Sequence, residues 1–258
     1  MSSDIAQYYL KARVDGTAPQ PVEQPGSLSE AYALALENAA AIGAVGAWKL
    51  GGTNAATREL FATDEAYFGP VFAAHVHEAT ANLVLGQAGF THGELELCFR
   101  LSEGVNDPGA LGNPVENLQD LIEELYLGVE FPWSPFDPPS DGLKVLVADC
   151  CASGALVVSR GNLAGDAAGA QAVRLTVDGE NGVEELAIGS TSNILGGPMQ
   201  ALADFLVLAQ AHGVQLQPGQ LVATGGCTPC VELPRGKTLR ADFGAFGSFE
   251  FSLQIPAS

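Results

Sequence analysis

Positive charge is scarce in this sequence: its 258 residues include 11 Lys and Arg against 30 Asp and Glu, a formal net charge of −19. Nucleic-acid backbones and anionic membrane surfaces are bound by clustered Lys and Arg, so this balance argues against either partner. Hydrophobic residues make up 47% of the chain and charged residues 16%, which is enough apolar material for a sizeable core. The composition therefore predicts a globular chain rather than a disordered one.

Long apolar runs and a disulfide framework are also lacking. No run approaches the roughly 18–20 apolar residues that span a bilayer. The opening MSSDIAQYYLKARVDG has neither the basic start nor the apolar segment of a signal peptide. The five cysteines are odd in number, and Cys150 and Cys151 are adjacent. These features favour a cytoplasmic location with reduced thiols.

The first 70 or so residues are Ala-rich and helical in pattern. Ser27 and Glu30 have the spacing of a capping box, which predicts a helix from Leu28 to about Ala44. The run AWKLGGTN then reads as a short strand, and a second short helix is expected over residues 55–61. We take residues 1–70 as a small helical section and residues 71–258 as a larger, β-rich body.

From about residue 80 the pattern changes to short, alternating or β-branched runs separated by Gly, Pro and Asp. Two helices are expected among them, from Pro114 to about Leu127 and from Pro198 to His212. There is no βαβ alternation, which argues against a doubly wound nucleotide-binding sheet. We therefore predict an α+β fold with a predominantly β body. The strand-like runs are ELELCFRL, LKVLVAD, SGALVVSR, AVRLTVDG, QLVATGG and GSFEFSL.

Three acidic residues are candidates for chemistry. In a strand, Glu94 and Glu96 of the run HGELEL project to the same face, about 6.6–7 Å apart at the backbone. Two such carboxylates repel each other unless water or a hard divalent cation lies between them. Glu130 follows in an apolar setting, LGVEFPW, where a carboxylate needs a partner to remain ionised. The alternatives are a solvated acidic strand face and an ordinary surface glutamate at a turn.

Lys49 is one of only four lysines and lies between Trp48 and Leu50. An ammonium group held in an apolar strand is a candidate for binding an anionic substrate or stabilising an enolate. The alternative is a surface lysine whose stem covers apolar area.

These residues belong to an ordered series of motifs. The series resembles the 2-keto-4-pentenoate hydratases of the fumarylacetoacetate hydrolase superfamily over about residues 45–253. Its members are Trp48-Lys49-Leu50-Gly51, Glu94 with Glu96, Glu130, Val147-Ala148-Asp149 with Ser153-Gly154, Leu195-Gly196-Gly197-Pro198, PGQLVATG (218–225), and Ala241-Asp242-Phe243 with Gly247-Ser248.

The resemblance implies a mixed β-roll or barrel, Mg²⁺ or Mn²⁺ as cofactor, a short 2-oxo acid as substrate, and a role in aromatic catabolism. It also implies a homo-oligomer. Carried over by position, Glu94, Glu96 and Glu130 are the expected metal ligands, and Lys49 contacts the carboxylate or enolate end of the substrate. The expected substrate-facing turns contain Ser153, Thr224, Gly225 and Thr228.

The sequence differs from the family at several residues around the expected metal ligands, including an expected acid/base residue. The family's D-x-P-D-[FY]-G segment carries an acid/base Asp, and Tyr67 stands in its place. Tyr67 can donate a proton only if its pKa, near 10 when unperturbed, is tuned. His92 replaces a basic residue, Trp133-Ser134-Pro135 replaces D-S-R, and Asp149-Cys150-Cys151-Ala152 replaces D-N-A-S. These exchanges indicate a changed substrate or reaction with the metal ligands retained.

Three other patterns are weaker evidence for a functional site. Cys227 and Cys230 have C-x-x-C spacing but no second pair to complete a zinc site. Gly236-Lys237-Thr238 ends like a phosphate loop, but residue 231 is Val where that motif requires Gly. His75 and His77 alternate and could bind a metal, although a loop-lining or surface role is the simpler interpretation.

The leading hypothesis is a metal-dependent hydratase that acts on an unsaturated short-chain 2-oxo acid through a metal-stabilised enolate. The same enolate would serve a 2-oxo diacid decarboxylase or an acylpyruvate C–C hydrolase. A catalytically silent homologue that supports an active relative is the alternative from a different class.

Overall fold

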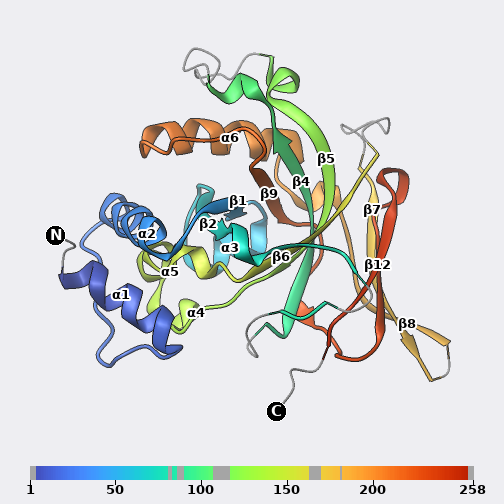
Figure 1. The fold of residues 1–258 in the computed structure, drawn as a ribbon, viewed down its shortest axis with the longest axis horizontal. Helices are drawn as coiled ribbons and strands as arrows, with labels where there is room; N and C mark the ends of the chain where they lie inside the picture. Colours follow the sequence, from blue (N-terminus) through green and yellow to red (C-terminus); the bar gives the residue numbers. More distant parts are fainter. Residues whose placement is uncertain are drawn as a thin grey trace.

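The computed structural model describes residues 4–80, 83–85, 90–106, 117–162, 170–180 and 182–254. Most of its strands form one large mixed sheet that curls into a half-barrel (Figure 1). The strands of this sheet are β1 (Val45–Gly51), β2 (Tyr67–Phe72), β3 (Val76–Glu78), β4 (His92–Leu101), β5 (Ile122–Phe131), β6 (Ala155–Arg160), β9 (Leu221–Gly226) and β10 (Val231–Glu232).

The large sheet has eight strands in the order β2-β1-β9-β4-β5-β6-β3, with β10 paired to β4. A separate sheet of four strands has the order β12-β11-β7-β8 and lies beside it in Figure 1. The strands of the second sheet are β7 (Ala172–Gly179), β8 (Gly182–Ser190), β11 (Thr238–Asp242) and β12 (Ser248–Ser252).

The helices gather mainly around the β1–β2 side of the half-barrel, and α6 crosses one end near β4 and β9 (Figure 1). None in the described part of the chain is long and apolar enough to cross a membrane. The helices are α1 (Asp4–Asp15), α2 (Leu28–Ile42), α3 (Ala55–Phe61), α4 (Pro138–Asp141), α5 (Leu143–Ala148) and α6 (Pro198–Ala211).

Local sequence signals explain the ends of the expected helices. The Ser27 hydroxyl accepts a hydrogen bond of 3.1 Å from the Glu30 amide, and the Glu30 carboxylate accepts one of 2.7 Å from the Gly26 amide. This arrangement satisfies free N–H groups at the start of α2. Pro198 opens α6, and Gly213, just beyond its end, has a φ of +70° that suits glycine.

The helix expected from Pro114 to about Leu127 is wrong within the described residues, which begin at 117. Leu118–Leu121 form one 3-10 turn, and β5 follows as a central strand between β4 and β6. From Leu125 onward β5 is buried on both faces. An apolar run buried on both faces shows no clear period, so a helix and a strand look alike in the sequence.

The strand expected for LKVLVAD is also wrong, because Leu143–Ala148 form α5. This helix has six residues, and the last four are buried. Its β-branched residues suggested a strand, but burial on all sides again removed the periodicity that would have distinguished the two. Packing against α2 favours the helix over local propensity.

The register of the large sheet brings the candidate residues to one place. Glu94 on β4 lies opposite Glu130 on β5, and Glu96 lies opposite Gly128. On the other side of β4, Glu96 is paired with Gly226 of β9. Lys49 on β1 is paired with Ala223 of β9, one strand further along. Side chains of matching parity on these strands share one face of the sheet.

The division of the chain near residue 70 stays a prediction. The strands β1 and β2, which lie before or at this point, pair within the large sheet. All five cysteines are unpaired thiols, in keeping with the expectation that they form no disulfide framework.

Candidate metal centre

Three carboxylates meet on one face of the large sheet. One oxygen each of Glu94, Glu96 and Glu130 lie within 4.8 Å of one another. Glu96 and Glu130 are fully buried, and Glu94 is partly exposed. Within the ranges that the structure describes, no other group of three His, Cys, Asp or Glu side chains is placed to hold a metal ion.

Backbone groups of β9 fix two of these carboxylates. The Gly225 amide donates a hydrogen bond of 2.9 Å to Oε2 of Glu96. At Gly226 a methyl group would overlap the Glu94 carboxylate, so glycine leaves the space that this side chain occupies. Gly225 has a φ of +103°, and a side chain there would overlap Thr53. Both glycines are therefore required by the geometry of the site.

Two threonines of the same segment hold β4 in register. The Thr224 hydroxyl donates a hydrogen bond of 2.9 Å to the Leu97 carbonyl, and the Leu95 amide donates one of 3.0 Å to the Thr228 hydroxyl. Both threonines are buried. Their hydroxyl groups contact the strand that carries Glu94 and Glu96. Their role in facing a substrate stays a prediction.

The protein compensates the buried carboxylates only in part. Oε1 of Glu96 and both carboxylate oxygens of Glu130 accept no hydrogen bond from the described residues. Burial and mutual repulsion raise the pKa of the Glu94 and Glu96 carboxyls, and burial raises that of Glu130. Buried, unsatisfied oxygen donors of this kind fit a hard divalent cation such as Mg²⁺ or Mn²⁺.

Lys49 is the cation nearest to the cluster. Its Nζ lies 3.3 Å from Oε1 of Glu130, and the residue is only 8% exposed. Burial alone would lower the pKa of the ammonium, but the carboxylates of Glu130, Glu94 and Glu96 outweigh it and raise the pKa. Lys49 therefore stays charged. One ammonium against three ionised carboxylates leaves two negative charges, which matches the charge of a divalent cation.

Tyr67 lies on the same side of the sheet as Lys49. The β1–β2 register pairs it with Gly51, two residues beyond Lys49, and its ring fills the space beside Gly51 and Gly52. Burial raises the pKa of the phenol, and the charge of Lys49 opposes this only in part. The hydroxyl therefore keeps its proton at neutral pH and can donate a hydrogen bond.

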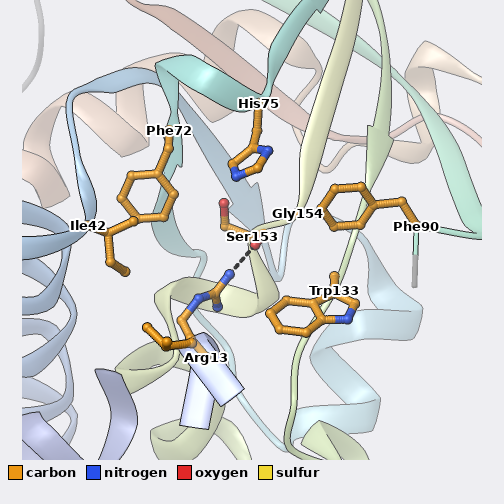
Figure 2. Close-up of a pocket in the computed structure, with 9 residues that line it drawn as sticks. Arg13, Ile42, Phe72, His75, Phe90, Trp133, Ser153 and Gly154 are labelled. Atoms are coloured by element: carbon orange, nitrogen blue, oxygen red, sulfur yellow. Dashed lines mark hydrogen bonds between the residues drawn. The ribbon is translucent and has the colours of Figure 1, made fainter. Parts of the chain in front are cut away.

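Ser153 is the candidate that lies apart from this group. Its hydroxyl faces a different cavity, together with His75 and Trp133 (Figure 2). The cavity is lined by none of the carboxylates and not by Lys49 or Tyr67. A role for Ser153 at the carboxylate cluster stays a prediction.

No motif in the sequence indicates a role for Arg13. Its guanidinium donates to the carbonyl oxygens of Asp149, at 2.7 Å, and of Ser153, and lies 2.9 Å from Oδ1 of Asp149. These partners are 136 and 140 positions away in the chain, so no local pattern reveals them. Arg13 thereby ties α1 to the segment between α5 and β6.

That segment has an unusual backbone. Cys150, Cys151 and Ala152 have φ angles of +54°, +55° and +52°, a left-handed conformation that costs roughly 1–2 kcal/mol for each residue with a side chain. The Cys151 thiol donates to the Phe68 carbonyl at 2.7 Å, and Gly69 leaves room for the segment. The turn therefore packs against β2 directly beside Tyr67.

The histidines and the C-x-x-C pair lie outside any ligand group of the described residues. His75 lines the cavity of Figure 2, and His77 lies on β3. Cys227 is buried and Cys230 exposed, and burial raises the pKa of the Cys227 thiol. This thiol therefore stays protonated near neutral pH, which does not favour thiolate chemistry.

Comparisons with known proteins agree with this architecture. No protein-family profile matches the chain. A 4-oxalocrotonate decarboxylase from Pseudomonas sp is 27% identical over 161 residues, which are 62% of this chain and 59% of that protein. The chain is thus matched over less than two thirds of the length of this curated relative.

Solved structures with a similar fold include two kinds of enzyme. The structure of 4-oxalocrotonate decarboxylase from Pseudomonas putida G7 with magnesium and adipate has a TM-score of 0.78 at 17% identity, covering 96% of this chain and 95% of that one. Fumarylpyruvate hydrolase from Pseudomonas aeruginosa with Mn²⁺ and pyruvate has a TM-score of 0.57 at 18% identity, covering 81% and 89%. The chain therefore has the fold of the fumarylacetoacetate hydrolase type that the sequence predicted.

Proposed function

We propose that this protein is a divalent-metal-dependent enzyme of the fumarylacetoacetate hydrolase superfamily that acts on a short 2-oxo acid. The observation that carries the proposal is the cluster of Glu94, Glu96 and Glu130, which have carboxylate oxygens within 4.8 Å of one another. Oε1 of Glu96 and both oxygens of Glu130 are buried and accept no hydrogen bond from the described residues. These three residues would hold Mg²⁺ or Mn²⁺. When bound, the cation supplies positive charge that favours an enolate at the 2-oxygen of the substrate.

The residues around the cluster have distinct roles in this proposal. Lys49 carries a permanent positive charge next to Glu130 and binds the carboxylate or enolate end of the substrate. Tyr67 holds its proton and donates a hydrogen bond to an oxygen of the reacting chain. The Gly225 amide keeps Glu96 aimed at the cluster. The apolar surroundings exclude water and strengthen each of these interactions.

Decarboxylation of an unsaturated 2-oxo diacid is the reaction favoured by two observations. The relatives named above include 4-oxalocrotonate decarboxylases in both the sequence and the structure comparisons. In addition, Tyr67 replaces the acid/base Asp expected of a hydratase. In this reaction the bond to the remote carboxylate breaks, its electron pair is delocalised to the 2-oxygen, and CO₂ leaves. A proton then adds to the resulting dienolate.

Hydration of an unsaturated 2-oxo acid, the reaction that the sequence favoured, remains the second candidate. It passes through the same enolate, and the cluster and Lys49 serve it equally well. A C–C hydrolase is supported by the likeness to fumarylpyruvate hydrolase, in which water cleaves an acyl group from the enolate-forming fragment. Product analysis distinguishes the three: released CO₂, a new hydroxyl-bearing carbon, or two acid fragments.

The experiment that tests the proposal is a product assay on metal-stripped protein supplied with Mg²⁺ or Mn²⁺. A vinylogous 2-oxo diacid and an unsaturated 2-oxo monoacid are incubated with the wild type and with Glu96→Gln. We expect CO₂ from the diacid, dependent on metal and lost in the variant. The alternative outcome is that no substrate turns over, and that the wild type and Glu96→Gln support the activity of a catalytically active relative equally well. In that case the protein is a silent scaffold.

Tyr67→Phe tests the proposed hydrogen-bond donor. The ring still fills the space beside Gly51 and Gly52, so the fold is kept. We expect kcat to fall by about 10²–10³-fold with little change in KM. Unchanged kcat would remove Tyr67 from the reaction. The measurement is steady-state kinetics on the substrate identified by the product assay.

A further inference from the structure

A second cavity, of about 180 Å³, lies where the ends of α1 and α2 approach the edge of the large sheet (Figure 2). None of the three carboxylates lines it, and neither do Lys49 and Tyr67. Ser153 lies just before β6 and is part of the lining. The cavity is therefore distinct from the proposed metal centre.

An unsatisfied hydroxyl points into this cavity. Ser153 is only 1% exposed, and its Oγ has no hydrogen-bond partner among the described residues. Figure 2 shows this hydroxyl directed toward the His75 imidazole from below. A buried hydroxyl without a partner costs roughly 1–3 kcal/mol, so its persistence calls for a ligand or another explanation.

The other polar groups of the cavity include hydrogen-bond donors. The Arg13 guanidinium lies 5.3 Å from the centre of the Trp133 ring, donates to the Asp149 and Ser153 carbonyls, and is ion-paired at 2.9 Å with Oδ1 of Asp149. Burial and the charge of Arg13 lower the pKa of His75, so its neutral imidazole carries one N–H donor and one acceptor nitrogen. A hydroxyl, an imidazole and a guanidinium together recognise a group that accepts several hydrogen bonds.

The remaining walls are apolar and largely aromatic. Phe72, Phe90, Trp133 and Ile42 surround the polar groups in Figure 2, and the His75 ring lies edge-on to that of Phe90 at 6.0 Å. An apolar cavity of about 150 Å³ is large enough for benzene. The volume here therefore suits one ring, or an unsaturated chain of similar size, with a single small polar substituent.

We propose that this cavity is a second binding site, specific for a small aromatic or unsaturated monocarboxylate. The carboxylate lies against the Ser153 hydroxyl, His75 and Arg13, and the flat body lies among Phe72, Phe90 and Trp133. The site rests on its own geometry and does not depend on the function proposed for the metal centre.

Benzoate is the probe for this site. It is titrated calorimetrically into protein kept metal-free with EDTA, so that binding at a metal ion cannot contribute. Ser153→Ala removes only an unbonded hydroxyl and should weaken benzoate binding about tenfold or more. His75→Leu should weaken it to a similar extent. The matched control is Ser159→Ala on β6, six residues along the chain from Ser153, which should bind as the wild type does.

Trp133 gives a second readout, because it is one of only two tryptophans in the chain. Benzoate should change the fluorescence of the wild type and of Glu96→Gln alike. In Trp133→Phe the fluorescence change should disappear, and calorimetry should show weaker benzoate binding because one aromatic wall of the cavity is reduced. Benzoate that fails to bind the wild type, or that binds Ser153→Ala and His75→Leu with unchanged affinity, overturns the site. Benzamide binding as tightly as benzoate overturns the assignment of a carboxylate.

Discussion

At the residue scale, the central feature is a charge imbalance. Three buried or half-buried carboxylates face one ammonium group, and the nearest ion pair is the 3.3 Å contact between Lys49 and Glu130. Desolvation makes such an excess of negative charge costly unless a cation joins the group. The same imbalance explains why Lys49 stays protonated although burial alone would favour its neutral form.

Lys49→Ala should lower catalytic efficiency without weakening metal binding. Removing the ammonium deprives the substrate of its positive partner, so we expect kcat/KM to fall about 10²–10³-fold. The remaining cluster is more negative, so its affinity for Mn²⁺ should be unchanged or higher. Steady-state kinetics and calorimetric Mn²⁺ titration check the two effects.

The matched control for this prediction is Lys11→Ala, since the Lys11 side chain is 69% exposed. It should leave both measurements unchanged. Normal kinetics for Lys49→Ala, or a loss of Mn²⁺ binding, would contradict the role given to Lys49.

At the element scale, the end of β9 shapes the site because two of its residues are glycines without side chains. Gly226 lets the strand approach Glu94 closely, Gly225 leaves room for Thr53, and the Gly225 amide holds Glu96. The sequence marked Gly225 through its family resemblance. It gave no sign of the part played by Gly226, because only the packing of β9 on β4 brings it to Glu94.

Gly226→Ala should therefore weaken metal binding by displacing a ligand. The added methyl group overlaps the Glu94 carboxylate and must displace it. We expect Mn²⁺ affinity to fall about tenfold or more, with the fold retained by circular dichroism. Gly43→Ala is the control, since a methyl group there meets nothing within 4 Å. Equal Mn²⁺ affinity in both variants and the wild type would refute the assigned position of Glu94.

The turn between α5 and β6 links stability to pH. Burial raises the pKa of Asp149 to about 6 from 3.8, against opposing contributions from Arg13 and from the Ser134 hydroxyl, which donates to Asp149 at 2.6 Å. The folded state thus binds this proton more tightly than the unfolded state. The resulting contribution to stability is complete below about pH 3.8 and is lost as the pH rises through about 6.

Asp149→Asn provides the comparison. We expect the free energy of unfolding of the wild type, relative to this variant, to be about 2–3 kcal/mol greater at pH 4 than at pH 8. Urea denaturation of metal-free protein at both pH values measures it. A difference between the two proteins that does not vary with pH would show that Asp149 has no raised pKa.

At the scale of the whole molecule, the sequence predicted the architecture better than the identity of two elements. Ordered motifs and strand alternation led to the half-barrel, and terminal sequence signals located α2 and α6. The errors at β5 and α5 arose where the element is buried on every side. Such a segment lacks the hydrophobic periodicity that distinguishes a helix from a strand. Arg13 and the cavity of Figure 2 depend on contacts across more than a hundred residues, which no local pattern encodes.

Two expectations at this scale stay predictions. Assembly into a homo-oligomer follows from the family resemblance, and a cytoplasmic location follows from the composition. The net charge of −19 is a property of the entire chain and adds long-range repulsion to the local repulsion among Glu94, Glu96 and Glu130. A bound divalent cation would relieve the local part.

The measurement that tests the central claim most directly is a calorimetric titration of metal-stripped protein with Mg²⁺ and Mn²⁺, with and without oxalate. Oxalate mimics the chelating end of a 2-oxo acid. We predict that the wild type binds the metal and then oxalate in a metal-dependent manner, and that Glu96→Gln binds neither while keeping its fold. Absence of metal binding in the wild type, or equal binding in both proteins, would contradict the metal centre formed by Glu94, Glu96 and Glu130.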